Sequence, residues 1–123
     1  MSNKIISFST NWNNKLENKA FTTIRRNNYY YQIGETYQIE LNGQNKGIAK
    51  IKRKWTLKAE NLNDLTCYLD TGYDKEATIE LLKKIYKNID LQKQQFDLIL
   101  LIYTGEKPKP KPKEQNLILE LQF

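Results

Sequence analysis

The sequence predicts a single α+β domain that is rich in β-strand. Three observations carry this prediction. Several short segments alternate apolar and polar residues, residues 75–87 have the apolar spacing of an amphipathic helix, and Gly, Asn and Asp separate the segments. The 123 residues are enough to bury a hydrophobic core without a metal or a disulfide. We therefore expect one domain over residues 1–123.

The N-terminal part is expected to contain extended segments and one helix. Residues 4–9 alternate as a first strand, and residues 11–18 have apolar side chains four positions apart, as in a short helix. Residues 21–26 and 29–33 are expected to be extended segments joined by a turn at Asn27-Asn28.

The next two segments predict a β-hairpin. Residues 37–41 alternate, residues 42–47 carry turn signals, and residues 48–57 form the return strand. A regular return strand places Trp55 in the core. It also places three lysines in one row on the opposite face, about 6.6 Å apart. These are Lys50, Lys52 and Lys54.

The remaining segments supply two helices and a central strand. A short helix capped by Asn61 or Asn63 is expected to end at Tyr68, before a turn at Gly72. A second, amphipathic helix covers residues 75–87, with an Asp cap in front of it and lysines in its last turns. Residues 96–103 form an apolar run that is typical of a buried central strand.

Positive charge is concentrated in two segments. The formal net charge is +6, yet residues 46–58 hold six cations and no acid, and residues 107–113 hold four lysines and no acid. Alternate prolines exclude a central strand at 107–113, so residues 105–116 are expected to be a loop before a final strand at 117–122. Concentrated positive charge favours a polyanionic partner such as RNA. The alternative is a solvated outer face of the strand.

Residue usage excludes several kinds of chemistry. Histidine is absent and Cys67 is the single cysteine. Ser-His-Asp and Cys-His catalysis, internal disulfides and zinc sites of His and Cys are therefore excluded, and no cofactor is expected. Cys67 is expected to be a small buried hydrophobic residue. The first residues lack the apolar core of a signal peptide, and no apolar run approaches the roughly 20 residues of a membrane span. A cytoplasmic location without a membrane is the expectation.

Two motifs resemble the ASCH family of PUA-like domains. NKAFTTIRR at residues 18–26 is followed by YxxG and a hairpin, and LDTGYDKEATIELLKKIY at residues 69–86 is followed by the strand FDLILL. The resemblance covers residues 4 to about 103. It implies a small mixed β pseudo-barrel with short helices at its ends, and a cleft between the TTIRR motif and the DTGY turn.

The first family motif, Gly-x-Lys-x-x-Thr-x-Arg, matches this chain in part. Its Thr falls on Thr23 and its Arg on Arg25, whereas its Gly falls on Asn18 and its Lys on Ala20. Lys19 is adjacent to the lysine position but points elsewhere on a regular backbone.

Some compact ASCH members are amidohydrolases that act on acetylated cytidine with a Lys–Thr–Glu arrangement. The glutamate position holds Thr71 in this chain, with Asp70 in front of it. The resemblance therefore implies no catalytic set unless Lys19 and Asp70 both move to assist Thr23.

The candidate nucleic-acid contacts are hydroxyl, cationic and aromatic side chains of the expected cleft and of the basic strand. They are Thr23, Arg25, Arg26, Tyr30, Lys50, Lys52, Lys54 and Tyr73. For Arg25 the open alternative is an internal salt bridge with Asp70 or another carboxylate, and for Tyr30 it is core packing.

Three functions stay open at this point. RNA or other nucleic-acid binding without catalysis is the first prediction. The second is an amidohydrolase-like reaction on a small modified nucleoside such as acetylcytidine, with Thr23 central and Lys19 or Asp70 assisting. The third is an interaction module in which a partner binds the Pro/Lys-rich loop as a polyproline helix.

Overall fold

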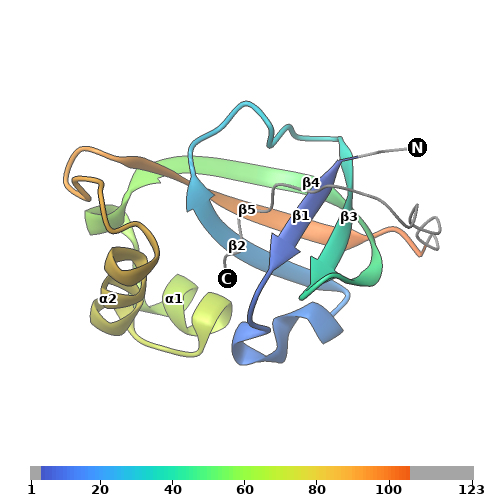
Figure 1. The fold of residues 1–123 in the computed structure, drawn as a ribbon, viewed down its shortest axis with the longest axis horizontal. Helices are drawn as coiled ribbons and strands as arrows, with labels where there is room; N and C mark the ends of the chain where they lie inside the picture. Colours follow the sequence, from blue (N-terminus) through green and yellow to red (C-terminus); the bar gives the residue numbers. More distant parts are fainter. Residues whose placement is uncertain (1–3, 106–123) are drawn as a thin grey trace.

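A curled five-stranded half-barrel forms the body of the computed structural model, which describes residues 4–105 (Figure 1). The sheet order is β1-β3-β4-β5-β2, with β1 parallel to β3 and the other pairs antiparallel. The strands are β1 (Ile5–Phe8), β2 (Ala20–Arg26), β3 (Thr36–Leu41), β4 (Gln44–Lys58) and β5 (Gln95–Tyr103). The predicted α+β, strand-rich class is confirmed. The expected loop beyond Gly105 and the strand at 117–122 lie outside the described residues.

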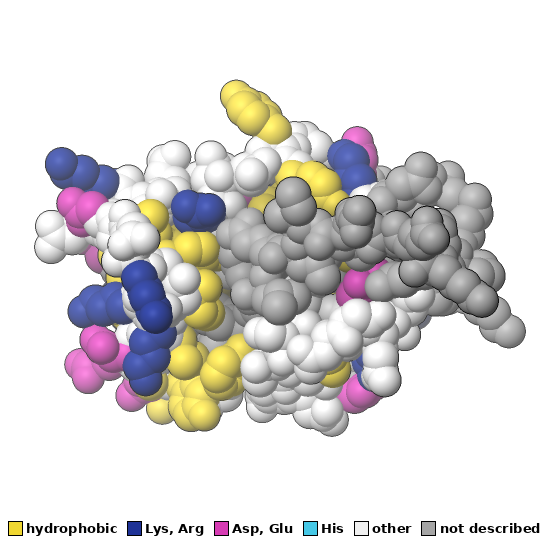
Figure 2. Space-filling view, viewed as in Figure 1, with side chains coloured by type: hydrophobic (Ala, Val, Ile, Leu, Met, Phe, Trp, Pro, Cys, Tyr) yellow, Lys and Arg dark blue, Asp and Glu magenta, His cyan; other side chains and the backbone are white. Residues whose placement is uncertain are grey.

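The helical segments lie below the sheet and at its left end in the view of Figure 1. They are η1 (Trp12–Glu17), η2 (Ala59–Asn61), α1 (Asp64–Thr71) and α2 (Lys75–Ile85). Figure 2 shows Lys and Arg side chains over α2 with hydrophobic side chains beside them. The helices cover part of the outer face of the sheet. Side chains from the helices, the loops and the sheet form one buried cluster there, which consists of Ile24, Ala59, Leu62, Cys67, Leu82, Tyr86 and Phe96. The expected burial of Cys67 is confirmed.

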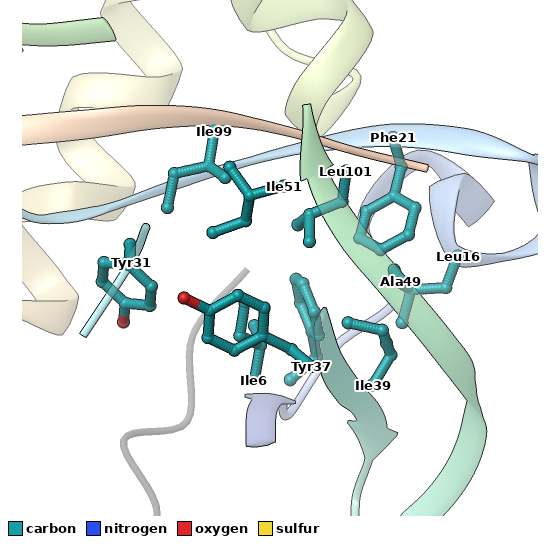
Figure 3. Close-up of a cluster of buried hydrophobic side chains, with 11 residues drawn as sticks. Ile6, Leu16, Phe21, Tyr31, Tyr37, Ile39, Ala49, Ile51, Ile99 and Leu101 are labelled. Carbon is teal, nitrogen blue, oxygen red and sulfur yellow. The ribbon is translucent and has the colours of Figure 1, made fainter. Parts of the chain in front are cut away.

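The inner face of the half-barrel holds the larger core, and side chains from different strands point toward one another there (Figure 3). The register explains this, because residues paired across neighbouring strands share a face. Phe21 pairs with Leu101, and Leu101 also pairs with Ile51. The full cluster consists of Ile6, Phe8, Leu16, Phe21, Tyr31, Tyr37, Ile39, Ala49, Ile51, Ile99 and Leu101.

The prediction of an extended segment at 29–33 is wrong, because residues 29, 30 and 33 lie in turns and residues 31 and 32 have no regular secondary structure. The reason is a local hydrogen-bond network that replaces strand pairing. The Tyr37 hydroxyl donates to the Tyr30 carbonyl oxygen at 2.5 Å and accepts from the Gln32 amide at 2.8 Å. The expected helix at 11–18 is a 3-10 segment in which Asn13 and Asn14 have φ values of 56° and 52°.

The prediction for β4 is wrong beyond Ile51 because the strand contains a bulge. Ile51 pairs with Leu101 and Arg53 pairs with Leu100, so Lys52 is an extra residue. Because of this extra residue, each later side chain of β4 points to the face opposite to the one that regular alternation predicts. Trp55 was expected in the core, but it lies on the outer face and is 48% exposed.

The same bulge breaks the expected row of three lysines. Lys54 turns to the inner face, where its Nζ donates to the Tyr31 carbonyl at 2.9 Å and lies 3.5 Å from Asp97 Oδ2. Lys50 and Lys52 stay exposed. Lys54 is therefore a positioning residue for the loop that precedes β3.

The helix α1 extends beyond its expected end at Tyr68. It begins after Asn63, whose side chain accepts from the Thr66 amide, and it runs through Asp70 to Thr71. Gly72 ends it in the left-handed conformation at a φ of 84°, as the tight-turn expectation required. Asp70 is thus a helical residue whose side chain is fully buried against the sheet.

Candidate nucleic-acid interface

Arg25 connects the two edge strands of the half-barrel. Its Nη2 donates to the Ser7 carbonyl oxygen of β1 at 2.6 Å, and its Nε donates to Thr23 Oγ1 at 3.2 Å. The guanidinium carbon lies 4.7 Å from the centroid of the Phe8 ring. Arg25 is 2% exposed, so these contacts hold the two edge strands together inside the fold. Thr23 is buried beside it.

Asp70 pairs with Lys15 instead of Arg25. Lys15 Nζ lies 3.0 Å from Asp70 Oδ1, and both side chains are buried. The hydroxyl of Thr22 lies 2.6 Å from the same oxygen. Burial lowers the pKa of Lys15, and the nearby Asp70 carboxylate opposes that lowering. Sequence patterns did not indicate a role for Lys15, because residues 15 and 70 are far apart in the chain.

The structure does not bring Lys19, Thr23 and Asp70 together. Thr23 faces the inside of the half-barrel, whereas Thr22 and Asp70 meet on the outer side of β2. Lys19 is exposed. Thr71, at the glutamate position of the family pattern, is buried, and its hydroxyl bonds the Cys67 carbonyl at 2.9 Å.

The remaining candidate aromatics and Arg26 have local contacts. The Tyr30 hydroxyl accepts from the Ile5 amide at 2.6 Å and donates to the Ile5 carbonyl at 2.8 Å, so it hydrogen-bonds the backbone of β1. Arg26 lies over the Tyr86 ring at 5.2 Å. Tyr73 is half-exposed and packs edge-on against Trp12 with a centroid distance of 5.9 Å.

A groove of about 410 Å³ opens between α1 and the outer face of the sheet. Leu98 and Leu100 of β5 contribute to its floor, and Trp55 and Leu69 are exposed at its walls. We call it the Trp55 groove. Its lining residues are Thr22, Trp55, Leu57, Thr66, Leu69, Leu98 and Leu100. Sequence reasoning missed it because the bulge at Lys52 decides which face carries Trp55.

Three exposed cations lie along β4 next to the Trp55 groove. Arg53 pairs with Leu100, which lines the groove, and Lys50 pairs with Ile102, the next outer-face residue of β5. Lys52 is the exposed bulge residue between them. We call Lys50, Lys52 and Arg53 the β4 cations. They replace the expected row of Lys50, Lys52 and Lys54.

Comparisons with protein-family models, with curated proteins and with solved structures find no match to this chain. The resemblance to the ASCH family therefore stays a prediction. Within residues 4–105, no helix combines the length and the apolar character that a membrane crossing requires. The same residues contain no group of three or more His, Cys, Asp or Glu side chains placed to hold a metal ion.

Proposed function

We propose that this chain is a PUA-like domain of the ASCH type that binds single-stranded RNA through the Trp55 groove and the β4 cations. One observation carries the proposal. An exposed indole ring stands over an apolar groove, and the same strand presents three exposed cations beside it. Aromatic platforms combined with basic surface are the usual means of holding unpaired bases and their phosphates.

The lining of the Trp55 groove is mostly apolar, which favours a nucleobase over water. Apart from Thr22 and Thr66, all of its lining side chains are apolar or aromatic. Stacking of a base on an aromatic side chain contributes about 1–3 kcal/mol and tolerates every base. Trp55 therefore supplies affinity, while the Leu side chains of β5 and α1 exclude water from the ring that enters.

The β4 cations suit a phosphate backbone that passes along the strand. Lys50, Lys52 and Arg53 are exposed, whereas Lys54 is held against Asp97 and the Tyr31 carbonyl. A single strand that places a base against Trp55 passes Arg53 next, because alternate residues of β4 share the outer face beyond the bulge. Charge complementarity thus points to RNA over an uncharged peptide.

The proposal is tested by fluorescence anisotropy with labelled single-stranded RNA and the variant Trp55→Ala. Loss of stacking should weaken binding about tenfold. Tyr29→Ala is the matched control, since Tyr29 is an aromatic residue that is 92% exposed and does not line the groove. Equal affinities of the wild type and Trp55→Ala, or no RNA binding by either, would reject the proposal.

A second candidate function, an amidohydrolase-like reaction on a modified nucleoside, is favoured by one observation. Thr22 lines the groove, and its hydroxyl lies 2.6 Å from Asp70 Oδ1, which also contacts Lys15. In such a reaction the Thr22 oxygen attacks the acetyl carbon and its proton passes to Asp70. The proton returns to the leaving amine as the C–N bond breaks, and water then releases acetate.

Acetate release from acetylcytidine tests this second function. Turnover that is present in the wild type and in Thr23→Val, and lost in Thr22→Val, would support it. The pair of variants is matched, because the two threonines are neighbours on opposite faces of β2. Absence of turnover in the wild type rejects the second function and leaves RNA binding as the proposal.

A further inference from the structure

Thr22 links the Trp55 groove to a buried ion pair. It lines the groove, and its hydroxyl bonds Asp70 Oδ1 at 2.6 Å. The same Oδ1 accepts a hydrogen bond from Lys15 Nζ at 3.0 Å. Asp70 Oδ2 is buried and has no hydrogen-bond partner among residues 4–105. The direction of the hydrogen bond between Thr22 and Asp70 follows from these contacts.

Asp70 Oδ1 accepts, and Thr22 donates. An ionised Asp70 has acceptors only. A neutral Asp70 would carry its proton on Oδ2, because Oδ1 already accepts from the Lys15 ammonium, and Oδ1 would still be an acceptor. In both states the Thr22 hydroxyl proton is directed to Asp70. Thr22 lines the groove, so where its oxygen is open to a ligand there it presents lone pairs and no donor.

We propose that Thr22 makes the Trp55 groove selective for a base that presents an exocyclic amine at its pairing edge, as cytosine and adenine do. This inference rests on the proposed function, because it names the bases that the RNA-binding groove prefers. Uracil and hypoxanthine carry a carbonyl oxygen at the corresponding position. That oxygen would face the Thr22 oxygen, and two acceptors that face each other cannot form a hydrogen bond.

The other lining residues of the groove do not oppose the preference for an exocyclic amine. Five of its seven lining residues are Trp or Leu, and the polar groups besides Thr22 are the Thr66 side chain and the indole N–H of Trp55. The indole N–H lies in the plane of its ring, so it does not face the edge of a base that is stacked on that ring. The Thr66 amide already donates to the Asn63 side chain, and among residues 4–105 no hydrogen bond holds the Thr66 hydroxyl in one direction. A hydroxyl that rotates freely accepts or donates equally well, so Thr66 does not discriminate between an amine and a carbonyl.

Binding of labelled oligocytidine and oligouridine by fluorescence anisotropy tests the proposal. We expect the wild type to bind oligocytidine about tenfold more tightly than oligouridine, which is the effect of one satisfied hydrogen bond. Thr22→Val keeps the shape of the side chain and removes the acceptor, so the preference should fall to about one. Thr22→Ser keeps the hydroxyl and should retain the preference.

A double variant tests the same inference without a change at Thr22. Lys15→Met with Asp70→Asn replaces the ion pair by neutral groups, and the Asn amide can donate to Thr22. The Thr22 hydroxyl then turns its proton toward the groove, so oligouridine should gain affinity relative to oligocytidine. Thermal unfolding of each variant establishes that the binding data come from folded protein.

The outcomes separate this inference from the proposed function. Binding of both oligonucleotides with equal affinity by the wild type, or an unchanged preference in folded Thr22→Val, would overturn the role of Thr22 and leave RNA binding intact. Binding of neither oligonucleotide would overturn the proposed function and this inference with it. A preference that is lost in Thr22→Val and kept in Thr22→Ser supports both.

Discussion

Removal of the β4 cations should flatten the salt dependence of RNA binding. The three side chains are exposed on the strand that carries Trp55. Each phosphate contact to a single strand contributes about 0.7 to the slope of log K against log salt. The variant Lys50→Ala, Lys52→Ala, Arg53→Ala should therefore lose about two units of slope. Over a fourfold rise in salt, the affinity of the wild type should fall about twentyfold more than that of the variant.

The assay is anisotropy of one labelled RNA at several salt concentrations. A control variant removes the same number of positive charges from exposed lysines outside the Trp55 groove, namely Lys84→Ala, Lys87→Ala and Lys93→Ala. It lowers the overall positive charge equally, but it should keep the slope of the wild type. Lys54→Met should also keep that slope, because Lys54 is directed to Asp97.

Two results would refute this reasoning. An unchanged slope in the β4 variant would mean that these side chains face only solvent. Equal flattening in the control variant would mean that RNA responds to net charge and not to a site on β4.

Two further predictions concern stability. Arg25→Ala should lower the free energy of unfolding by about 3 kcal/mol, because the Ser7 carbonyl loses a charged donor. The RNA affinity of the folded variant should stay unchanged. Urea unfolding measures the loss of stability, and a difference near zero would contradict this prediction. Burial raises the pKa of Tyr103 to about 12 from 10.0. The folded state keeps this proton when the unfolded state has lost it, so stability falls as pH rises from 10 toward 12. Tyr103→Phe should reduce that fall in unfolding experiments at alkaline pH, and identical pH profiles would contradict it.

Apolar patterns predicted much of the sheet, namely alternation in residues 37–41 and 48–57 and a continuous apolar run in residues 96–103. The expected segments at 37–41, 48–57 and 96–103 lie within β3, β4 and β5, because successive side chains of these strands alternate between the two faces over most of their length. The turn at Asn42-Gly43 lies where the hairpin signal placed it, and both residues have positive φ. Local patterns are sufficient where local geometry is regular.

The position of Trp55 could not be predicted, because it depends on one extra residue. The bulge at Lys52 has no glycine or proline to mark it. A strict period of two therefore assigned Trp55 to the core and Lys54 to the surface, and the structure exchanges them. The consequence for function is large, since the indole ring becomes the exposed wall of the groove.

The site around Asp70 could be predicted only in part. The family pattern drew attention to Asp70 and to the threonines of β2, but it favoured Thr23 over Thr22. Thr22 contacts Asp70 because β2 turns that face toward α1. The packing of α1 against β2 decides which face this is, and local sequence patterns do not reveal it. Lys15 follows two asparagines with positive φ, so helical spacing did not indicate its direction.

The intrinsic fluorescence of Trp55 tests the central claim most directly. The variant Trp12→Phe leaves Trp55 as the single tryptophan of the chain. Titration with single-stranded RNA should quench this emission in a saturable way, with the dissociation constant that anisotropy gives for the same RNA, because a stacked base is in contact with the indole ring. Binding that leaves the Trp55 emission unchanged would contradict the account.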